Sequence, residues 1–234
     1  MNSYKRVLIK LSGEALSTKD EVLDYNAINT TALVLKELSQ QGIEIGVVVG
    51  GGNIIRGRSV ATSNRTLADH MGMLATTINS LALQDALLGH GCEASVLSAI
   101  EMYQICEPFA QRYAVSRLQN SEIVIFACGI GRPYFSTDTA AALRALEIGA
   151  DVLICAKNID GVYDKDPRKY TDAKKYDFVT YDEVIAKNLQ ALDIAAITLC
   201  RDGRLPIKVV ELLNAEQLKA AVLQKDSTGT LISV

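Results

Sequence analysis

Continuous apolar runs alternate with helical patterns along this chain, and this alternation restricts its fold more than any other feature. Runs such as residues 7–9 and 43–49 show little alternation of polar and apolar residues, as expected for strands that are buried on both faces. Strands of this kind that are separated by helices form a mainly parallel sheet with helices on both faces. The sequence therefore predicts an α/β fold, and its 234 residues suffice for a single domain spanning residues 1–234.

The individual elements follow from periodicity and capping signals. Strands are expected over residues 6–11, 43–49, 94–97, 122–128, 151–156, 207–212 and 230–234. Helices are expected over residues 27–41, 67–88, 108–118 and 137–148, and two more begin near Thr180, which has Glu183 at capping-box spacing, and near Asn214. The turn-rich segment 161–177 is expected to be an exposed loop.

In the expected helix over residues 67–88, apolar residues recur at intervals of three and four. This spacing predicts one buried helical stripe, formed by Leu67, Met71, Leu74, Ile78 and Leu81.

Composition excludes several classes of function. The net charge is −3 without a cluster of cations, which argues against nucleic acid as the main partner. The longest uncharged stretch, near residues 71–84, is too short and too polar to span a bilayer. We expect neither a signal peptide nor a membrane partner.

Five cysteines without a Cys-x-x-Cys pair, and only two histidines, argue against a zinc site. Cys128 and Cys155 lie in apolar runs and are expected to be small core residues. This cysteine usage favours a reducing compartment, so the expected location is cytoplasmic.

Two of the expected strands end in loops suited to phosphate. Lys10-Leu11-Ser12-Gly13 follows the first strand, and Gly50-Gly51-Gly52-Asn53, with Arg56 shortly after, follows the second. Backbone N–H groups that a ligand can approach closely, together with fixed cations, are what a polyphosphate requires. The alternative for Lys10 is a surface lysine at a strand end. Neither loop is a P-loop, and Ile55 stands where a Gly-x-Gly-x-x-Gly motif would need its third glycine.

Segment 129–139 follows another strand and carries two aromatic residues, an arginine and several hydroxyls. It therefore lies at the edge where open parallel sheets bind ligands. The alternative is a structural loop in which Thr137 or Asp138 caps the next helix. Asp69 could be a favourable acid near a helix start, and Asp193 could be an N-cap or a partner of Lys10.

Taken together, the motifs resemble those of bacterial uridylate kinases (UMP kinases) of the amino acid kinase superfamily. The motifs, which occur in order, are Lys-Leu-Ser-Gly-Glu-Ala, Gly-Gly-Gly-Asn-x-x-Arg-Gly, Asp-His-Met-Gly-Met-Leu-Ala-Thr, Ser-Thr-Asp-Thr-Ala-Ala and Asp-Gly-Val-Tyr-x-x-Asp-Pro. The resemblance implies a three-layer αβα sandwich, a homohexamer, and transfer of the γ-phosphoryl group of ATP to UMP in pyrimidine nucleotide biosynthesis. It implies Mg²⁺ carried by the nucleotide rather than by a dedicated protein site, and inhibition by UTP at the acceptor pocket.

The resemblance also implies residue roles. ATP would be held by Lys10, Leu11, Ser12, Gly13, Gly52, Arg56, Tyr163 and Asp166. UMP would be held by Gly51, Asp69, Ile130, Gly131, Arg132, Pro133, Tyr134, Phe135, Ser136 and Thr137. The residues implied in catalysis are Lys10, Arg56, Asp138 and Asp193, with the two aspartates orienting the lysine and the metal.

Four positions depart from the family pattern. Ile130 replaces a threonine, Arg132 replaces an asparagine, and Lys157 stands where a threonine or asparagine near the ATP base is commoner. Residues 17–21 lack the glycine-rich stretch linked to GTP activation. Two alternatives remain: a superfamily enzyme acting on a carboxylate or carbamate, against which the block at residues 69–73 argues, and a non-catalytic nucleotide-binding relative.

Overall fold

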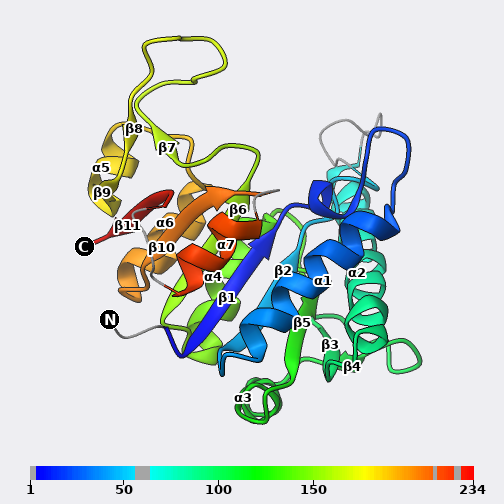
Figure 1. Cartoon of the computed structure of the whole chain (residues 1–234). Coiled ribbons are helices and arrows are strands. Elements are labelled where there is room, and N and C mark those ends of the chain that lie inside the picture. The colour runs from blue at the N-terminus through cyan, green and yellow to red at the C-terminus, as the bar shows by residue number, and fades with distance from the viewer. Residues whose placement is uncertain (1–3, 56–63, 213–214, 224–227) are drawn as a thin grey trace.

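A nine-stranded sheet forms the centre of the part of the chain that the computed structural model describes, which is residues 4–55, 64–212, 215–223 and 228–234 (Figure 1). The strand order is β4-β3-β5-β2-β1-β6-β10-β11-β9, and among these pairs only β10–β11 is antiparallel. The expected mainly parallel sheet is therefore confirmed. The strands are β1 (Arg6–Leu11), β2 (Glu44–Val49), β3 (Ala94–Ser98), β4 (Glu107–Pro108), β5 (Ile123–Ala127), β6 (Val152–Lys157), β9 (Phe178–Thr180), β10 (Ile207–Glu211) and β11 (Thr230–Ser233).

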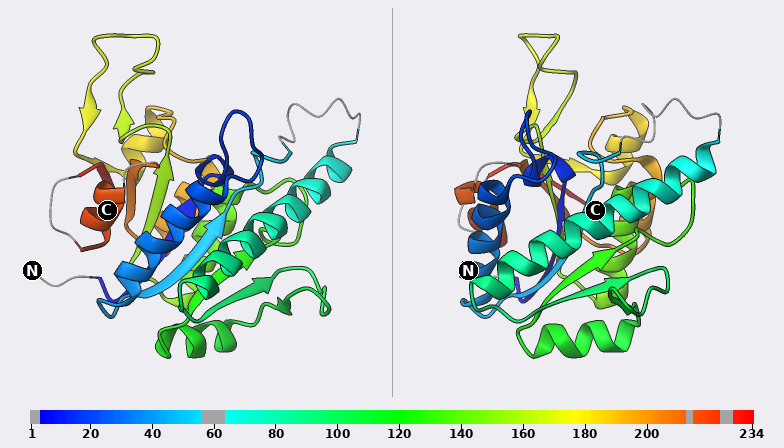
Figure 2. Two further views of the ribbon diagram at one scale, coloured as in Figure 1. Left: turned by 45° about the vertical axis from the view of Figure 1, so that its right-hand side comes forward. Right: turned by 90° about the vertical axis from the view of Figure 1, so that its right-hand side faces the viewer.

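Helices cover both faces of the sheet, which confirms the three-layer arrangement (Figure 2). One face carries α1 (Tyr25–Ser39), α2 (Arg65–Gly89) and α7 (Ala215–Leu223). The other carries α3 (Gln111–Gln119), α4 (Thr137–Ile148), α5 (Tyr181–Ala186) and α6 (Ile194–Asp202). A short 3₁₀ helix, η1 (Gly13–Leu16), follows β1. None of the described helices combines the length and hydropathy needed to cross a membrane.

The alternation of side chains along β1 divides its residues between the two faces. Val7, Ile9 and Leu11 belong to the core beneath α1, whereas Leu8 belongs to the core beneath α4. Because side chains of a strand alternate with a period of two, Lys10 shares the face of Leu8. The lysine at the end of the first strand is thus directed toward the helix α4 rather than toward α1.

The buried stripe expected on the second helix is wrong. Four of its members are exposed: Leu67 by 55%, Met71 by 36%, Leu74 by 54% and Ile78 by 46%. The inward face of α2 is instead made mainly of small and polar residues over its first half, where it lies beside a cavity, and it becomes apolar only at Leu83 and Leu87, which join the core beneath α1. The inward residues include Ala68, Ala75, Thr76, Asn79, Ser80 and Leu83.

Other expectations hold with changes at the ends of elements. The strand over residues 6–11 and the helix over residues 137–148 have the expected bounds, and Thr180 caps α5 through a capping box. Pro108 belongs to β4, so α3 begins later, at Gln111. The sequence did not predict β9, and it indicated α6 only through Asp193 as a possible N-cap. Asn214 lies outside the described residues.

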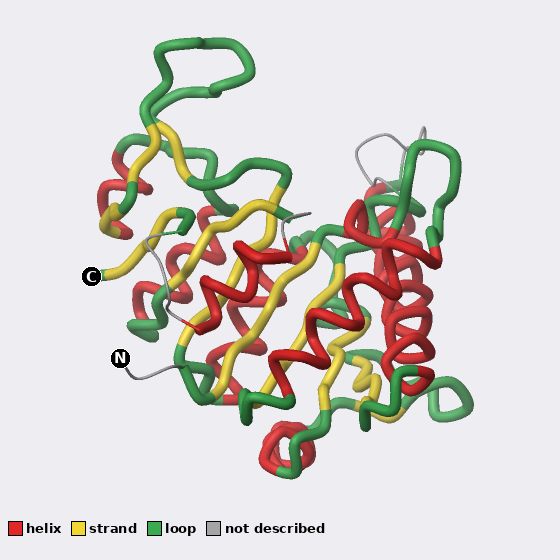
Figure 3. The backbone as a smooth tube through the Cα atoms, viewed as in Figure 1, coloured by secondary structure: helices red, strands yellow, loops and turns green. Residues whose placement is uncertain are grey.

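Segment 161–177 is more ordered than a plain loop. Its two ends form an antiparallel pair, β7 (Val162–Tyr163) with β8 (Lys175–Tyr176). Figure 3 shows the chain between them projecting beyond the sheet as a long excursion. This ribbon begins close after β6 and so stands beside the carboxyl edge of the central strands.

Candidate functional site

Four loops meet at the carboxyl ends of the parallel strands. They follow β1, β2, β5 and β6, which are neighbours in the sheet, and begin near Ser12, Gly50, Cys128 and Asn158. Open α/β sheets bind ligands at this edge. The loops that the sequence singles out for phosphate and for the acceptor are thus brought to one place from distant parts of the chain (Figure 1).

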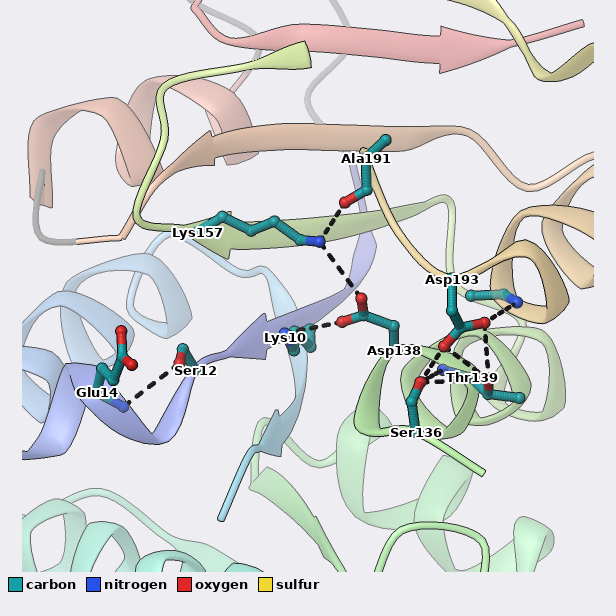
Figure 4. A network of polar contacts seen from close by, with 10 residues as sticks. Lys10, Ser12, Glu14, Ser136, Asp138, Thr139, Lys157, Ala191 and Asp193 are labelled. Carbon is teal, nitrogen blue, oxygen red and sulfur yellow. Dashed lines mark hydrogen bonds and ion pairs between the residues drawn. The ribbon is translucent and has the colours of Figure 1, made fainter. Parts of the chain in front are cut away.

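At the centre of this edge, the carboxylate of Asp138 lies between two lysines (Figure 4). Lys10 Nζ is 2.8 Å from Asp138 Oδ1, and Lys157 Nζ is 3.3 Å from Asp138 Oδ2. Lys157 also donates a hydrogen bond to the carbonyl of Ala191. The parallel register pairs Lys10 with Cys155, and Lys157 is two residues beyond Cys155 on the same face of β6. Both lysines therefore reach the first turn of α4.

Within this cluster, charge pairing has a larger effect on the pKa values of Lys10 and Asp138 than burial has. Burial alone would lower the pKa of Lys10, but the charge of Asp138 and its hydrogen bond, with Cys155 and Asp193 also contributing, raise that pKa overall. Burial would raise the pKa of Asp138, but the charges of Lys10 and Lys157 and their hydrogen bonds lower it overall. Lys10 and Asp138 are therefore both charged at neutral pH.

The first two loops pack against each other through glycines. A Cβ added to Gly13 would lie 2.2 Å from Asn53 Oδ1 and 2.7 Å from the carbonyl oxygen of Gly50. A Cβ on Gly51 would lie 2.8 Å from the carbonyl oxygen of Gly72 on α2. Such distances exclude any side chain at Gly13 or Gly51.

Gly52 differs from these neighbours, because a Cβ there would meet no atom of the described residues within 4 Å. Packing within the described part of the protein thus explains the glycines at positions 13 and 51 but does not require one at position 52. Ser12 caps η1 by accepting a hydrogen bond from the backbone N–H of Glu14, at 3.4 Å. Leu11 is buried at the end of β1. Arg56 lies outside the described residues.

A cavity of about 290 Å³ lies between α2 and the loop that follows β5. Most of the residues that the resemblance assigns to UMP line it together: Gly51, Asp69, Ile130, Arg132, Phe135, Ser136 and Thr137. Gly52, assigned to ATP, lines it as well. Gly131, Pro133 and Tyr134 are not among the lining residues. Gly131 instead packs against the backbone of Ala99, where a Cβ would lie 2.8 Å from the carbonyl oxygen.

Among the lining residues to which the sequence assigned no role in the site are Thr76 and Cys128. The hydroxyl of Thr76 accepts a hydrogen bond from the backbone N–H of Cys128, at 2.9 Å. Cys128 is fully buried, as expected, although its φ is +62°. The available signal for Thr76 is its place two helical turns beyond Asp69 and one turn beyond Gly72, on the same face of α2.

Asp69 already has partners at the rim of the cavity. Its Oδ2 accepts a hydrogen bond of 2.8 Å from the backbone N–H of Tyr134 and lies 3.6 Å from the guanidinium of Arg65. Arg65 also lies over the ring of Tyr134, 5.0 Å from its centroid. Asp69 sits one turn inside α2, which begins at Arg65, so it is not a first-turn acid.

Asp193 caps α6, as one reading of the sequence expected, by accepting from the backbone N–H of Ala196 at 2.7 Å. Its carboxylate also accepts hydrogen bonds from the hydroxyls of Ser136 and Thr139 at the start of α4 (Figure 4). The direct partner of Lys10 is Asp138, whereas Asp193 acts on the pKa of Lys10 only through its charge. Ser136 caps α4, so the alternative in which Thr137 or Asp138 is the cap is wrong.

A second cavity, of about 450 Å³, lies at the base of the β7–β8 ribbon. Tyr163 and Asp166, which the resemblance assigns to the ATP base or ribose, both line it. The Tyr163 hydroxyl donates to Asp160 at 2.7 Å. Ala191, which accepts from Lys157, is next to Gln190 of this cavity, and Asp138 is next to Thr137 of the other. The lysine–aspartate cluster therefore lies between the two cavities.

Comparison with known proteins gives one family and several close relatives. Residues 5–211 match the model of the amino acid kinase family. The chain is 48% identical to a uridylate kinase of Xanthomonas oryzae pv. oryzae over 98% of this chain and 97% of that protein.

Solved structures agree with this match. A UMP kinase from Bacillus anthracis superposes with a TM-score of 0.95 at 36% identity, covering 99% of this chain and 97% of that one. A UMP kinase from Ureaplasma parvum gives a TM-score of 0.93 at 33% identity, with both chains fully covered. A uridylate kinase from Archaeoglobus fulgidus gives 0.71 at 27% identity, covering 97% and 99% of the two chains.

Proposed function

Because this chain belongs to the amino acid kinase family, we propose that it is a UMP kinase, which transfers the γ-phosphoryl group of ATP to UMP and releases ADP and UDP. The observation that carries the proposal is the pair of cavities with the Lys10–Asp138–Lys157 cluster between them. The names of the relatives described above, uridylate kinase and UMP kinase, support UMP as the acceptor.

The cavity at the β7–β8 ribbon would take the base and ribose of ATP, against Tyr163 and Asp166. Its phosphates would run toward Lys10, Ser12 and Gly52, with Arg56 as a further cation. The cavity beside α2 would hold UMP with its phosphate directed at Lys10. In this arrangement the two anionic nucleotides would meet at the ammonium group of Lys10.

The chemistry needs positioning and neutralisation of charge rather than a general base. An oxygen of the UMP phosphate forms a new bond to the γ-phosphorus as the bond to the β-phosphate oxygen breaks, and the electron pair leaves on ADP. A phosphate monoester has a second pKa of about 6, so the attacking oxygen is already ionised at neutral pH. Lys10, held by Asp138, stabilises the charge on the transferred group.

Magnesium bound to ATP would supply further neutralisation of the phosphates. Within the described residues, no group of three or more His, Cys, Asp or Glu side chains is arranged to hold a metal. The two nearby carboxylates, Asp138 and Asp193, already accept from lysines and hydroxyls. Phosphate oxygens and water are the usual ligands of Mg²⁺ in such sites.

We further propose a homohexamer, a cytoplasmic location and inhibition by UTP. The exposed stripe Leu67–Met71–Leu74–Ile78 on α2 supports association, since apolar rows of this kind mark protein interfaces. All five cysteines are free thiols in the structure, as suits a reducing compartment. UTP carries the same base as UMP and would compete for the cavity beside α2.

An assay of ADP release with Mg²⁺ and ATP tests the substrate pair. We expect turnover with UMP well above that with CMP, dTMP, aspartate or carbamate. A preference for aspartate or carbamate would favour the rival superfamily chemistry. Nucleotide binding without ADP release on any acceptor would favour a non-catalytic relative.

A further inference from the structure

A buried amide on α2 holds the loop that follows β2. Asn79 is fully buried, and its Nδ2 donates hydrogen bonds to the carbonyl of Gly50 at 2.7 Å and to Asn53 Oδ1 at 2.8 Å. In return, Asn53 Nδ2 donates to Asn79 Oδ1 at 3.1 Å. The two amides therefore form a reciprocal pair in which each side chain both donates and accepts.

This pair sets how closely the two glycine-bearing loops approach each other. Asn53 also donates to the carbonyl of Val22 at 2.8 Å, in the segment between η1 and α1. The space where a Gly13 side chain would be is filled by Asn53 Oδ1 and the Gly50 carbonyl oxygen, at 2.2 and 2.7 Å from the ideal Cβ position. Both of these oxygens accept a hydrogen bond from Asn79.

We infer that Asn79 is a positioning residue for the ATP phosphates, an inference that rests on the proposed function. It contacts no substrate itself. By fixing the Gly50 carbonyl and the Asn53 amide, it fixes the place of Gly52 relative to Ser12 and Gly13, and hence the backbone N–H groups of both loops. If Asn79 had only a structural role, its substitution would lower the stability of the fold without a specific effect on ATP binding. An unpaired polar group lowers stability wherever it is buried.

The neighbouring residue provides a matched control. Ser80 is also fully buried on α2, but the hydrogen bond of its hydroxyl goes to the carbonyl of Thr76 in the same helix, at 2.7 Å. Ser80→Ala therefore removes a buried polar group from the same helix without releasing either loop.

The test compares Asn79→Asp and Asn79→Ala with Ser80→Ala and the unchanged protein. Aspartate keeps the shape but cannot donate to the Gly50 carbonyl. We expect KM for ATP to rise about tenfold in both Asn79 variants, since one or two hydrogen bonds that order the loop are lost. KM for UMP should stay within about twofold, and Ser80→Ala should change neither constant.

Two additions keep the result interpretable. Asn53→Ala removes the same amide pair from the side of the partly exposed loop, so it should also raise KM for ATP and serves as the test if the Asn79 variants fold poorly. The Asn53→Ala/Asn79→Ala double variant should have a KM for ATP no higher than that of the more impaired single variant. Calorimetric titration with ATP alone reports loop positioning whatever the acceptor is, so it separates this inference from the proposed reaction. Wild-type-like ATP binding in Asn79→Asp and Asn53→Ala, or an equal rise in both KM values, would overturn it.

Discussion

Lys10, the penultimate residue of β1, forms a 2.8 Å ion pair with Asp138, in the first turn of α4. The pair exists because Ser136, two residues earlier, caps the helix and leaves the Asp138 carboxylate to face the sheet. An acid near a helix N-terminus is favoured by the helix dipole, so the dipole of α4 stabilises the carboxylate that pairs with Lys10. This arrangement places a fixed cation where two phosphates would meet.

Replacing Lys10 by methionine keeps most of the side-chain volume and removes the charge. Loss of a group that stabilises transition-state charge costs about 10²–10³ in rate, so we expect kcat to fall by that factor. Steady-state kinetics measures the loss, and calorimetry with UMP checks that acceptor binding is retained. A variant that binds UMP normally and turns over within a few-fold of the wild type would remove Lys10 from the mechanism.

Asp138→Asn should lower both kcat and stability, because it leaves two partly buried ammonium groups facing a neutral amide. The double variant Asp138→Asn/Lys157→Met relieves the repulsion and should recover part of the melting temperature while kcat stays low. Asp24→Asn, which alters a carboxylate at the start of α1, controls for loss of an acid near a helix N-terminus. Full kcat in the single variant would leave Asp138 with a structural role only.

Stability at acid pH should depend on Lys157. The pKa of Asp138 is lowered in the folded protein, with Lys10 and Lys157 as the causes that overcome burial. Its stabilisation is therefore present above the unfolded pKa, about 3.9, and is lost as pH falls through the folded pKa. Lys157→Met brings the folded pKa up, so unfolding in acid should begin at higher pH. Melting curves between pH 3 and 6 measure this change, with Lys19→Met at an exposed position as the control. Coinciding curves for the two variants would contradict the prediction.

Acceptor choice should favour UMP over CMP. The backbone of the segment after β5 can bond the edge of uracil, and a site that pairs one pattern of donors and acceptors leaves polar groups unpaired with the other. Comparable kcat/KM for the two nucleotides would refute recognition of uracil by this segment.

Ile130 lines the acceptor cavity, so Ile130→Thr should restore a hydroxyl contact. We expect UMP to bind more tightly by about 0.5–1.5 kcal/mol, the net value of one hydrogen bond. Calorimetric titration measures the change, and Ile105→Thr, at an exposed position on a different segment, is the control. An unchanged dissociation constant would place the bound base away from Ile130.

The exposed stripe on α2 predicts self-association. Leu74→Glu puts a charge in the middle of this row, where Leu74 is 54% exposed, and should shift the protein to smaller species in light scattering coupled to size-exclusion chromatography. Leu33→Glu changes an exposed leucine on α1 and should leave the mass unchanged. If Leu74→Glu retains the wild-type mass, the stripe is not an interface.

The same helix shows why sequence reasoning located the fold better than the site. Strong local signals set β1 and α4, whose bounds were predicted without error. On α2, periodicity identified the helix but assigned the wrong buried face, because an apolar row has the same spacing whether it meets the core or another surface. Inward residues such as Thr76 and Asn79 are polar, and only their tertiary partners explain their burial.

Local sequence patterns also do not predict which residues of the site contact one another. Lys10, Asp138 and Lys157 come from three separate elements, and their meeting depends on the register of β1 with β6. The family pattern marks Lys157 only as a mismatch, yet Lys157 is one of the two lysines that pair with Asp138. Motif resemblance supplied Asp138 itself, whereas the sequence alone left it as a possible cap.

The strand order also has a consequence for synthesis of the chain. β1 pairs on one side with β2, made shortly afterwards, and on the other with β6, which ends at Lys157. At a translation rate of about 5–20 residues per second, one edge of β1 remains unpaired for on the order of ten seconds, until β6 has been synthesised. Unpaired strand edges template wrong associations, so this edge of β1 is open to incorrect pairing during synthesis until β6 has been made.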